Sequence, residues 1–354
     1  MSAGIRGPMA AAALVVLALA AAGSAPRVAD ADGGPRADGI AAGFGAIWTT
    51  SRNGLVRIDP GTRRITAEVP ARIESMPTLT TGEGSIWMLT LHAVTRIDPQ
   101  RNRADRPVRL QHSTVAFAVG AGALWVADYD DPVLRKLDPR TGRELASISG
   151  IGLHAEAMVA TKSAIWVASI GPWRQNSHGE IKPVGPGSVA RVDPRNNRVV
   201  ARIPVGRGPG AIATGHGAVW VANSRGLRPE FSVTRIDTAS NRVTATIRLR
   251  RALPFPAPAV PVAPLAAVAI GGAYAWILSP GRFLRGGIDT SGGTLFRIDS
   301  RSNHVVADRL RGSSLPDAIV PAHGSLWIGS PGNGYVLQVM PKTMRTTRTL
   351  IPFG

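Results

Sequence analysis

Three acidic residues stand at the same distance from three tryptophans and could together bind a cation. Asp38, Glu156 and Asp317 each precede a tryptophan by ten residues. Carboxylate oxygens are the ligands that Ca²⁺ and Mg²⁺ prefer, and a cation or a shared proton compensates carboxylates held close together. His154 lies two residues before Glu156 and could move a proton. This pattern predicts a hard-cation site for Ca²⁺ or Mg²⁺, with solvated carboxylates around a water-filled channel as the alternative.

A second group of polar and aromatic residues falls at or beside irregular segments, where binding residues concentrate in folded proteins. The long irregular segments are 169–188, 223–231, 250–264 and 279–294, which we expect on one face of the fold. The candidate binding residues are His112, His154, Asp128, Trp173, Arg174, His178, Asn223 and Arg225. We expect them to contact a small molecule or a protein partner. The alternative is that these loops lengthened by neutral drift.

Several kinds of chemistry are excluded or lack a local signature. The 354-residue chain has no cysteine, so it has no disulfide, thiolate nucleophile, Cys-ligated zinc or iron–sulfur cluster. The motifs G-x-S-x-G, H-E-x-x-H and G-x-x-x-x-G-K-[ST] are also missing from it. Catalysis stays open, because residues from separated segments can assemble a site.

An internal repeat fixes the positions of these residues. Seven of the eight tryptophans recur at one repeat position, 38 to 56 residues apart: Trp48, Trp87, Trp125, Trp166, Trp220, Trp276 and Trp327. Downstream of six of them comes a basic residue, an aliphatic residue and an aspartate, beginning at Arg57, Arg96, Lys136, Arg191, Arg235 and Arg297. A large side chain present in every repeat is suited to filling the core.

Each repeat contains four short alternating segments rich in β-branched residues, with glycine or Asp-Pro turns between them and no amphipathic helix. In the clearest copy the segments are 211–214, 218–222, 232–236 and 242–249. Four strands in a repeat of this length predict an all-β, seven-bladed β-propeller of antiparallel strands over residues 38–354. The last expected strand, 345–353, belongs to the seventh repeat, so we expect the ring to close without strand exchange. The alternative is that residues 25–36 add an outer strand.

The repeated residues resemble the YVTN-type β-propeller repeat. The stretch from Gly215 to Asn223 reads G-H-G-A-V-W-V-A-N, and R-I-D follows at Arg235. The resemblance extends over residues 38–354 and implies a propeller related to streptogramin-lyase-like proteins. That relationship would imply a metal-assisted elimination that uses acidic and histidine residues on the face of the propeller where the long loops lie.

The sequence departs from the lyase pattern at the third residue after each repeated tryptophan, where that family would carry glutamate. These residues are Ser51, Thr90, Asp128, Ser169, Asn223, Ser279 and Ser330. We therefore expect a non-catalytic scaffold that binds a ligand or protein through its loops. The alternative is a metal-dependent lyase or hydrolase that uses Asp38, Glu156, Asp317 and His154.

The net charge of +18 comes from 41 Lys and Arg against 23 Asp and Glu. Propeller geometry places the turns between third and fourth strands on one face, and those turns are basic: Arg63, Arg64, Arg101, Arg103, Arg140, Arg143, Arg195, Arg198, Arg242, Arg301, Lys342 and Arg345. Such a face could dock on an anionic cell-wall polymer or lipid head groups, with a solvated rim as the alternative. Only four of the basic residues are lysine, and we expect no nucleic-acid partner.

The N-terminus has the pattern of a secretory signal peptide. Arg6 precedes an apolar run over 9–22, followed by small residues that suit cleavage after Ser24. We therefore expect a signal peptide at 1–24, a linker at 25–37, and a secreted or periplasmic monomer. An uncleaved leader would instead anchor the protein to a membrane, and no span is expected after cleavage.

Overall fold

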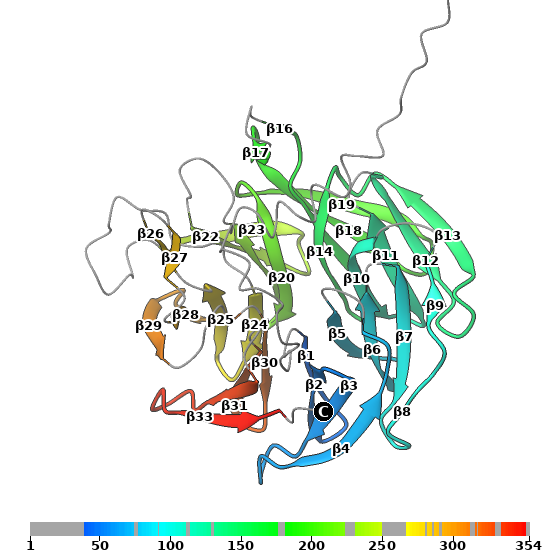
Figure 1. Cartoon of the computed structure of the whole chain (residues 1–354). Coiled ribbons are helices and arrows are strands. Elements are labelled where there is room, and N and C mark those ends of the chain that lie inside the picture. Colours follow the sequence, from blue (N-terminus) through cyan, green and yellow to red (C-terminus); the bar gives the residue numbers. More distant parts are fainter. Residues whose placement is uncertain are drawn as a thin grey trace, which may run out of the picture.

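The computed structural model describes residues 39–73, 77–90, 92–110, 114–128, 131–175, 181–223, 231–249, 267–279, 282–284, 287–289, 292–311, 316, 318–329 and 334–351. These residues form seven antiparallel sheets of four or five strands arranged around a central axis, and two further two-stranded sheets (Figure 1). The predicted all-β, seven-bladed β-propeller is confirmed.

The blades follow one another in sequence, each running from an innermost to an outermost strand. Blade 1 comprises β1 (Ile40–Gly43), β2 (Ala46–Ser51), β3 (Gly54–Ile58) and β4 (Ile65–Pro70). Blade 2 comprises β5 (Thr78–Gly82), β6 (Ser85–Thr90), β7 (Ala93–Asp98), β8 (Arg103–Ala104) and β9 (Val108–Arg109). Blade 3 comprises β10 (Thr114–Gly120), β11 (Ala123–Asp128), β12 (Val133–Leu137) and β13 (Glu144–Ser149). Blade 4 comprises β14 (Ala155–Ala160), β15 (Ile165–Ser169), β18 (Gly187–Asp193) and β19 (Arg198–Val205). Blade 5 comprises β20 (Pro209–Gly215), β21 (Ala218–Asn223), β22 (Ser232–Asp237) and β23 (Arg242–Arg248). Blade 6 comprises β24 (Ala267–Gly271), β25 (Tyr274–Ser279), β28 (Gly292–Asp299) and β29 (Val305–Arg311). Blade 7 comprises β30 (Ala318–Ala322), β31 (Ser325–Gly329), β32 (Tyr335–Val339) and β33 (Thr346–Leu350).

The core lies between the blades. Seven separate hydrophobic clusters each join residues of two neighbouring blades, including one between blade 7 and blade 1. The seven repeated tryptophans are at most 2% exposed and lie in the second strands. The predicted role of the repeated tryptophan as core is therefore confirmed.

Ring closure also agrees with the prediction. Blade 1 is built from β1–β4 and blade 7 from β30–β33, so in the described residues each blade uses strands that are contiguous in the chain. The last strand ends at Leu350, and residues 352–353 of the expected strand lie outside the described residues.

Blade 2 departs from the four-strand repeat at its outer edge, where two short strands pair with β7. Asp105 forms an ion pair with Arg96 at 3.0 Å, and its own N–H donates to the Arg96 carbonyl. Pro107, which has no N–H to donate, follows in the gap between β8 and β9. The break therefore has a local cause.

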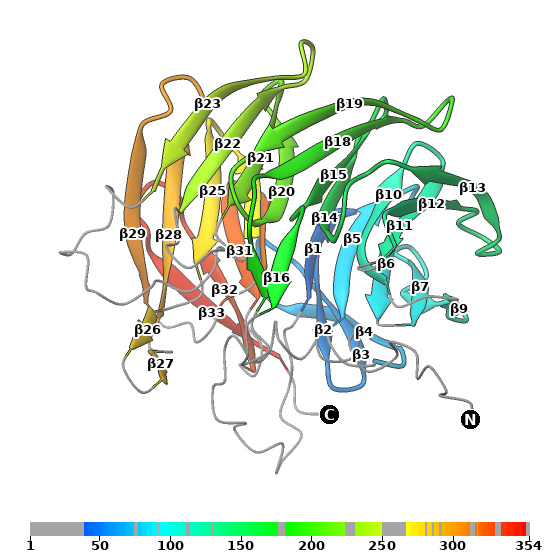
Figure 2. The same cartoon turned by 90° about the horizontal axis from the view of Figure 1, so that it is seen from above.

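Two further hairpins are inserted between the second and third strands of their blades. In blade 4, β16 (Trp173–Gln175) pairs with β17 (Ile181–Pro183), and in blade 6, β26 (Arg282–Leu284) pairs with β27 (Gly287–Asp289). They extend to the side of the propeller opposite the turns that join β18 to β19 and β22 to β23 (Figure 2). We call the side with the hairpins the loop face and the other side the turn face.

A basic residue lies opposite the tryptophan in six blades and often reaches the next blade. Arg57, Lys136, Arg191 and Arg235 each stack over the tryptophan of their own blade, 5.2–5.5 Å from its ring centroid. The side chain of Lys136 donates to Pro194 O at 2.9 Å and to Asn197 Oδ1 at 3.3 Å. These contacts join neighbouring blades at the turn face and add cation–π attraction to the apolar packing.

Asn197, which accepts the bond from Lys136, has a left-handed backbone at the end of the turn between the third and fourth strands of its blade. Asn102, Asn197, Asn241 and Asn303 have φ between 49° and 58°, a region that asparagine tolerates. Blade 3 has Gly142 at the same place, where a Cβ would overlap Val108 of blade 2. Arg96, the basic residue of blade 2, bonds Asp105 of its own blade.

The described residues include no helix with the length and hydrophobicity of a membrane span.

Candidate functional site

Several predicted site residues lie outside the described residues. These are Asp38, His112, His178, Arg225 and Asp317. Within the described ranges, no three histidine or acidic side chains gather closely enough to hold a metal ion. Because two of its three carboxylates are not described, the predicted Ca²⁺ or Mg²⁺ site remains a prediction.

Glu156 occupies a β-bulge at the start of the innermost strand of blade 4. Ala155 pairs with Ser169 and Ala157 with Ala168, so Glu156 is the extra residue between two paired positions. Its side chain is half-buried, with Oε1 shielded from solvent. The equivalent position ten residues before the tryptophan is also the bulged residue in β10 and β20. A bulge redirects its side chain, so this position is set apart from the regular strand in three blades.

His154 belongs to the crossover that leads into β14. Its backbone is left-handed, with φ of 56°, and its carbonyl accepts the N–H of Ile170 at 3.0 Å. The preceding carbonyl of Leu153 accepts the N–H of Gly171 at 3.2 Å. These two bonds attach the crossover of blade 4 to the start of its long loop.

Asp128 takes part in a network of charges at the loop-face end of β11. Arg135 Nη1 lies 2.8 Å from Asp128 Oδ2, and Arg135 Nη2 lies 2.6 Å from Asp131 Oδ2. Burial lowers the pKa of Arg135, but its hydrogen bond to Asp131 and the charges of Asp128, Asp131 and Glu144 outweigh this effect and raise it. The side chain of Asp128 is 9% exposed. This geometry supports a structural role, and the binding role of Asp128 stays a prediction.

Asn223 is fully buried at the loop-face end of β21. Its amide donates to Thr234 Oγ1 at 2.9 Å and lies 3.3 Å from the carbonyls of Val221 and Ser232. A Cβ at Gly206 would approach the amide carbon to 2.8 Å. Asn223 therefore fills a tightly packed position inside the blade, and contact with a ligand stays a prediction there too.

Trp173 and Arg174 lie on β16, the first strand of the extra hairpin in blade 4. Arg174 is exposed and pairs across the hairpin with Lys182, while the side chain of Trp173 is outside what the structure describes. The hairpin therefore presents at least one cation at the loop face.

An apolar pair beside this hairpin was not among the predicted site residues. Leu153 and Val184 are each 47% exposed. Gly171 N donates to Leu153 O at 3.2 Å, and Val184 N donates to Pro172 O at 3.0 Å, so the crossover and the hairpin base adjoin. We call Leu153, His154, Pro172, Arg174 and Val184 the blade 4 shelf. The only sequence signal for it was the length of the insertion after β15.

Two glycines allow the close approach that forms the shelf. Gly152 has φ of 105°, and a Cβ there would lie 2.8 Å from the Ser169 side chain. Gly171 has φ of 82°, and a Cβ there would lie 2.9 Å from Pro186 O. Both positions combine a left-handed backbone with tight packing, which favours glycine. The base of the shelf is therefore held in one arrangement.

The turn face is built from aspartate-capped turns with exposed cations. The pKa of each turn aspartate lies below its usual value, because N–H and hydroxyl groups two or three residues later donate to the carboxylate: Asp59, Asp98, Asp138, Asp193, Asp237 and Asp299. All twelve predicted turn cations are exposed.

Comparisons with known proteins give the fold and no family. No family model and no curated protein sequence matches the chain. A structure of Kuenenia stuttgartiensis hydrazine synthase superposes with a TM-score of 0.61 at 15% identity, covering 94% of this chain and 99% of that one. A structure of U3-55K gives 0.61 at 9% identity, covering 84% and 88%. The designed protein Ika8 gives 0.56 at 10% identity, covering 89% and 86%. At these identities the likeness shows a propeller fold that serves unrelated roles.

Proposed function

We propose that the chain is an extracytoplasmic β-propeller of the YVTN repeat type that binds a ligand or protein partner on its loop face. The repeated tryptophans, each opposite a basic residue in six blades, support the repeat type. The leader-like segment over 9–22 supports export from the cytoplasm.

The blade 4 shelf carries the binding part of this proposal. Backbone bonds of Gly171 and Val184 place its exposed Leu153 and Val184 on adjoining segments, near the exposed Arg174. Apolar contact area beside a cation suits a partner with an apolar group next to a carboxylate or other anion. Because backbone bonds and packed glycines hold the base, binding there orders little further chain.

The second supporting observation is the distribution of insertions. Both extra hairpins of the described residues lie in connections between the second and third strands, and none lies in a turn between the third and fourth. Extra structure therefore accumulates at the loop face while the turn face keeps its repeat. Loops on a rigid scaffold are where binding residues usually lie.

Photo-crosslinking tests this proposal. A photoreactive phenylalanine analogue is placed at Val184 in the full chain, expressed in its own cells, and the matched control places it at Val243, which is 41% exposed on β23. We expect a discrete crosslinked product from Val184 and none from Val243. Equal products from both positions, or no product from Val184, would overturn binding at the shelf.

A further inference from the structure

Phe44 stands out on the turn face because its conformation is unfavourable for its residue type. It lies in the turn between β1 and β2 with φ of 55° and is 44% exposed. The same turn position in five other blades holds Glu83, Ala121, His216, Gly272 and His323. A bulky side chain with a left-handed backbone is an outlier, and the fold accepts glycine at this position in blade 6. The turn itself therefore does not require phenylalanine.

Arg57 connects Phe44 to the basic turn of blade 2. Its guanidinium donates to Phe44 O at 3.4 Å and, on the other side, to Pro99 O and Asn102 Oδ1 at 3.3 Å each. The turn between β7 and β8 carries Arg101 and Arg103, which are 75% and 72% exposed. The turn of blade 1, on the same face, adds the exposed Arg63 and Arg64. We call Phe44 and these four arginines the Phe44 patch.

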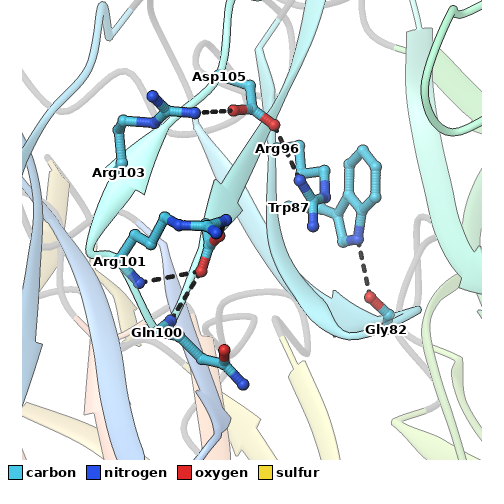
Figure 3. Close-up of polar contacts among 8 residues, drawn as sticks. Gly82, Trp87, Arg96, Gln100, Arg101, Arg103 and Asp105 are labelled. Carbon is cyan, nitrogen blue, oxygen red and sulfur yellow. Dashed lines mark hydrogen bonds and ion pairs between the residues drawn. The ribbon is translucent and has the colours of Figure 1, made fainter.

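The carboxylates of this region are recessed or already engaged. Asp98 is 15% exposed and accepts the backbone N–H groups of Gln100 and Arg101 at 2.9 and 3.0 Å (Figure 3). Asp105 lies between Arg96 and Arg103, at 3.0 and 3.7 Å. Asp59 accepts the N–H of Thr62 at 2.7 Å. Arg101 Nη1 also pairs with Asp98 Oδ2 at 3.0 Å. The side chains of Arg101 and Arg103 nevertheless stay 75% and 72% exposed, against 15% and 35% for Asp98 and Asp105, so an approaching surface meets positive charge first.

An exposed aromatic group on the same face as four exposed arginines matches the head-group layer of an anionic bilayer. Surface binding to membranes combines burial of apolar side chains below the phosphates with attraction of cations to anionic lipids. A soluble anionic polymer offers no apolar layer for Phe44. A single-stranded nucleic acid needs a groove that follows its backbone, whereas the patch consists of protruding turns.

We propose that the Phe44 patch docks on an anionic phospholipid bilayer, with Phe44 inserted beneath the phosphates and the four arginines against them. This surface lies opposite the blade 4 shelf and goes beyond the loop-face function without resting on it. Docked in this way, the propeller would hold its loop face away from the membrane.

A site-specific fluorophore tests the proposal, because the chain has no cysteine. An environment-sensitive dye is attached to Gln100→Cys in the full chain and, as the matched control, to Arg174→Cys on the loop face. Vesicles of phosphatidylcholine with phosphatidylglycerol should shift the emission of the dye at residue 100 to the blue. Pure phosphatidylcholine should not, and the dye at residue 174 should not respond. The dye reports its own surroundings, so an apolar segment elsewhere in the chain cannot produce this pattern.

Phe44→Gly separates docking from folding. Glycine suits φ of 55°, so the melting temperature should stay the same or rise, while vesicle affinity should fall about tenfold. Arg101→Gln should weaken vesicle binding about fivefold. Val243→Ala, at an exposed apolar residue outside the patch, should leave the affinity unchanged.

Four outcomes would overturn the proposal. One is no shift at residue 100 with anionic vesicles, and another is an equal shift at residue 174. The third is a vesicle affinity that Phe44→Gly leaves unchanged. Soluble polyphosphate or a single-stranded oligonucleotide that binds as tightly as the vesicles and displaces them would likewise contradict docking on a bilayer and assign the patch to a polymer.

Discussion

The guanidinium of Arg191 lies 5.3 Å from the ring centroid of Trp166, its cross-strand partner in blade 4. From there it donates to Asn241 Oδ1 at 2.8 Å and to Thr238 O at 3.2 Å in blade 5. A single side chain thus joins the tryptophan of one blade to the turn of the next. The same arrangement joins blade 1 to blade 2 and blade 3 to blade 4.

Removing this contact should destabilise the propeller more than removing a basic residue that stays within its blade. Arg191→Met is expected to lower the free energy of unfolding by about 2 kcal/mol, since it loses the cation–π contact and leaves two acceptors unpaired. Arg96→Met loses an ion pair between partly exposed groups and should cost about 0.5 kcal/mol. Urea denaturation measures both, and equal losses would show that the contact between blades adds nothing.

Replacing Gly142 of blade 3 by asparagine, the residue at this turn position in four other blades, should lower the stability of the fold. Gly142→Asn adds a Cβ that would overlap Val108, so we expect a loss of about 2 kcal/mol. The matched control is Gly272→Asn, which has φ of 61° and open space around the added Cβ. That variant should change stability by less than about 1 kcal/mol. If both variants melt at the same temperature, the contact between Val108 and Gly142 does not restrict the residue.

The turn aspartates should make the fold sensitive to acid. Their pKa values are lowered in the folded chain, so the stabilisation is complete above the ordinary aspartate value of 3.8 and is lost as the pH falls below it toward the folded values. Asp237→Asn keeps an oxygen that can accept from Ser240, which donates to Asp237 at 2.6 and 2.7 Å, but removes the titration. Denaturation curves across this pH range should therefore show a smaller loss for the variant. An identical loss would contradict a stabilising role for this carboxylate.

The network around Asp128 should behave as structure. Asp128→Ala leaves Arg135 with its remaining partners at a site where the Arg135 side chain is 14% exposed, so we expect a loss of about 2 kcal/mol or more in unfolding free energy. The double variant Asp128→Leu with Arg135→Met should recover most of this loss, because no buried charge is left unpaired; the other two partners of Arg135, Asp131 and Glu144, are 40% and 46% exposed. Unchanged stability of the single variant Asp128→Ala would contradict this structural role.

The sequence was sufficient for the architecture because each blade repeats the same core residue. Trp48 and its six counterparts mark the second strands, and an aspartate marks the end of the third in six blades, followed by proline in four of them. The role of the basic residue in the R-I-D motif was not predicted. The motif was visible, but its bond to Asn197 or Asn241 depends on how neighbouring blades are placed.

The candidate sites were also harder to predict, because they depend on how segments that are distant in the sequence are placed in the fold. Insertion lengths correctly placed extra structure on the loop face, yet nothing in the residue types of Leu153 and Val184 distinguishes them from core aliphatics. Their exposure follows from the crossover and the hairpin base meeting at Gly152 and Gly171. Asp128 and Asn223, two of the predicted binding residues, are polar but lie buried in contacts within their own blades, and their binding role stays a prediction.

Cysteine reactivity in intact cells tests the central claim, that a partner occupies the loop face, most directly. Single cysteines at Val184 and Val243 are labelled with a membrane-impermeant maleimide, in cells and in the purified full chain; the natural chain contributes no thiol. We predict that both sites react in cells, which places the propeller outside the cytoplasm. Val184→Cys should react severalfold more slowly in cells than in the purified chain, while Val243→Cys reacts equally in both. Equal reactivity of Val184→Cys in the two settings would contradict occupancy of the shelf, and no labelling of either site in cells would contradict export.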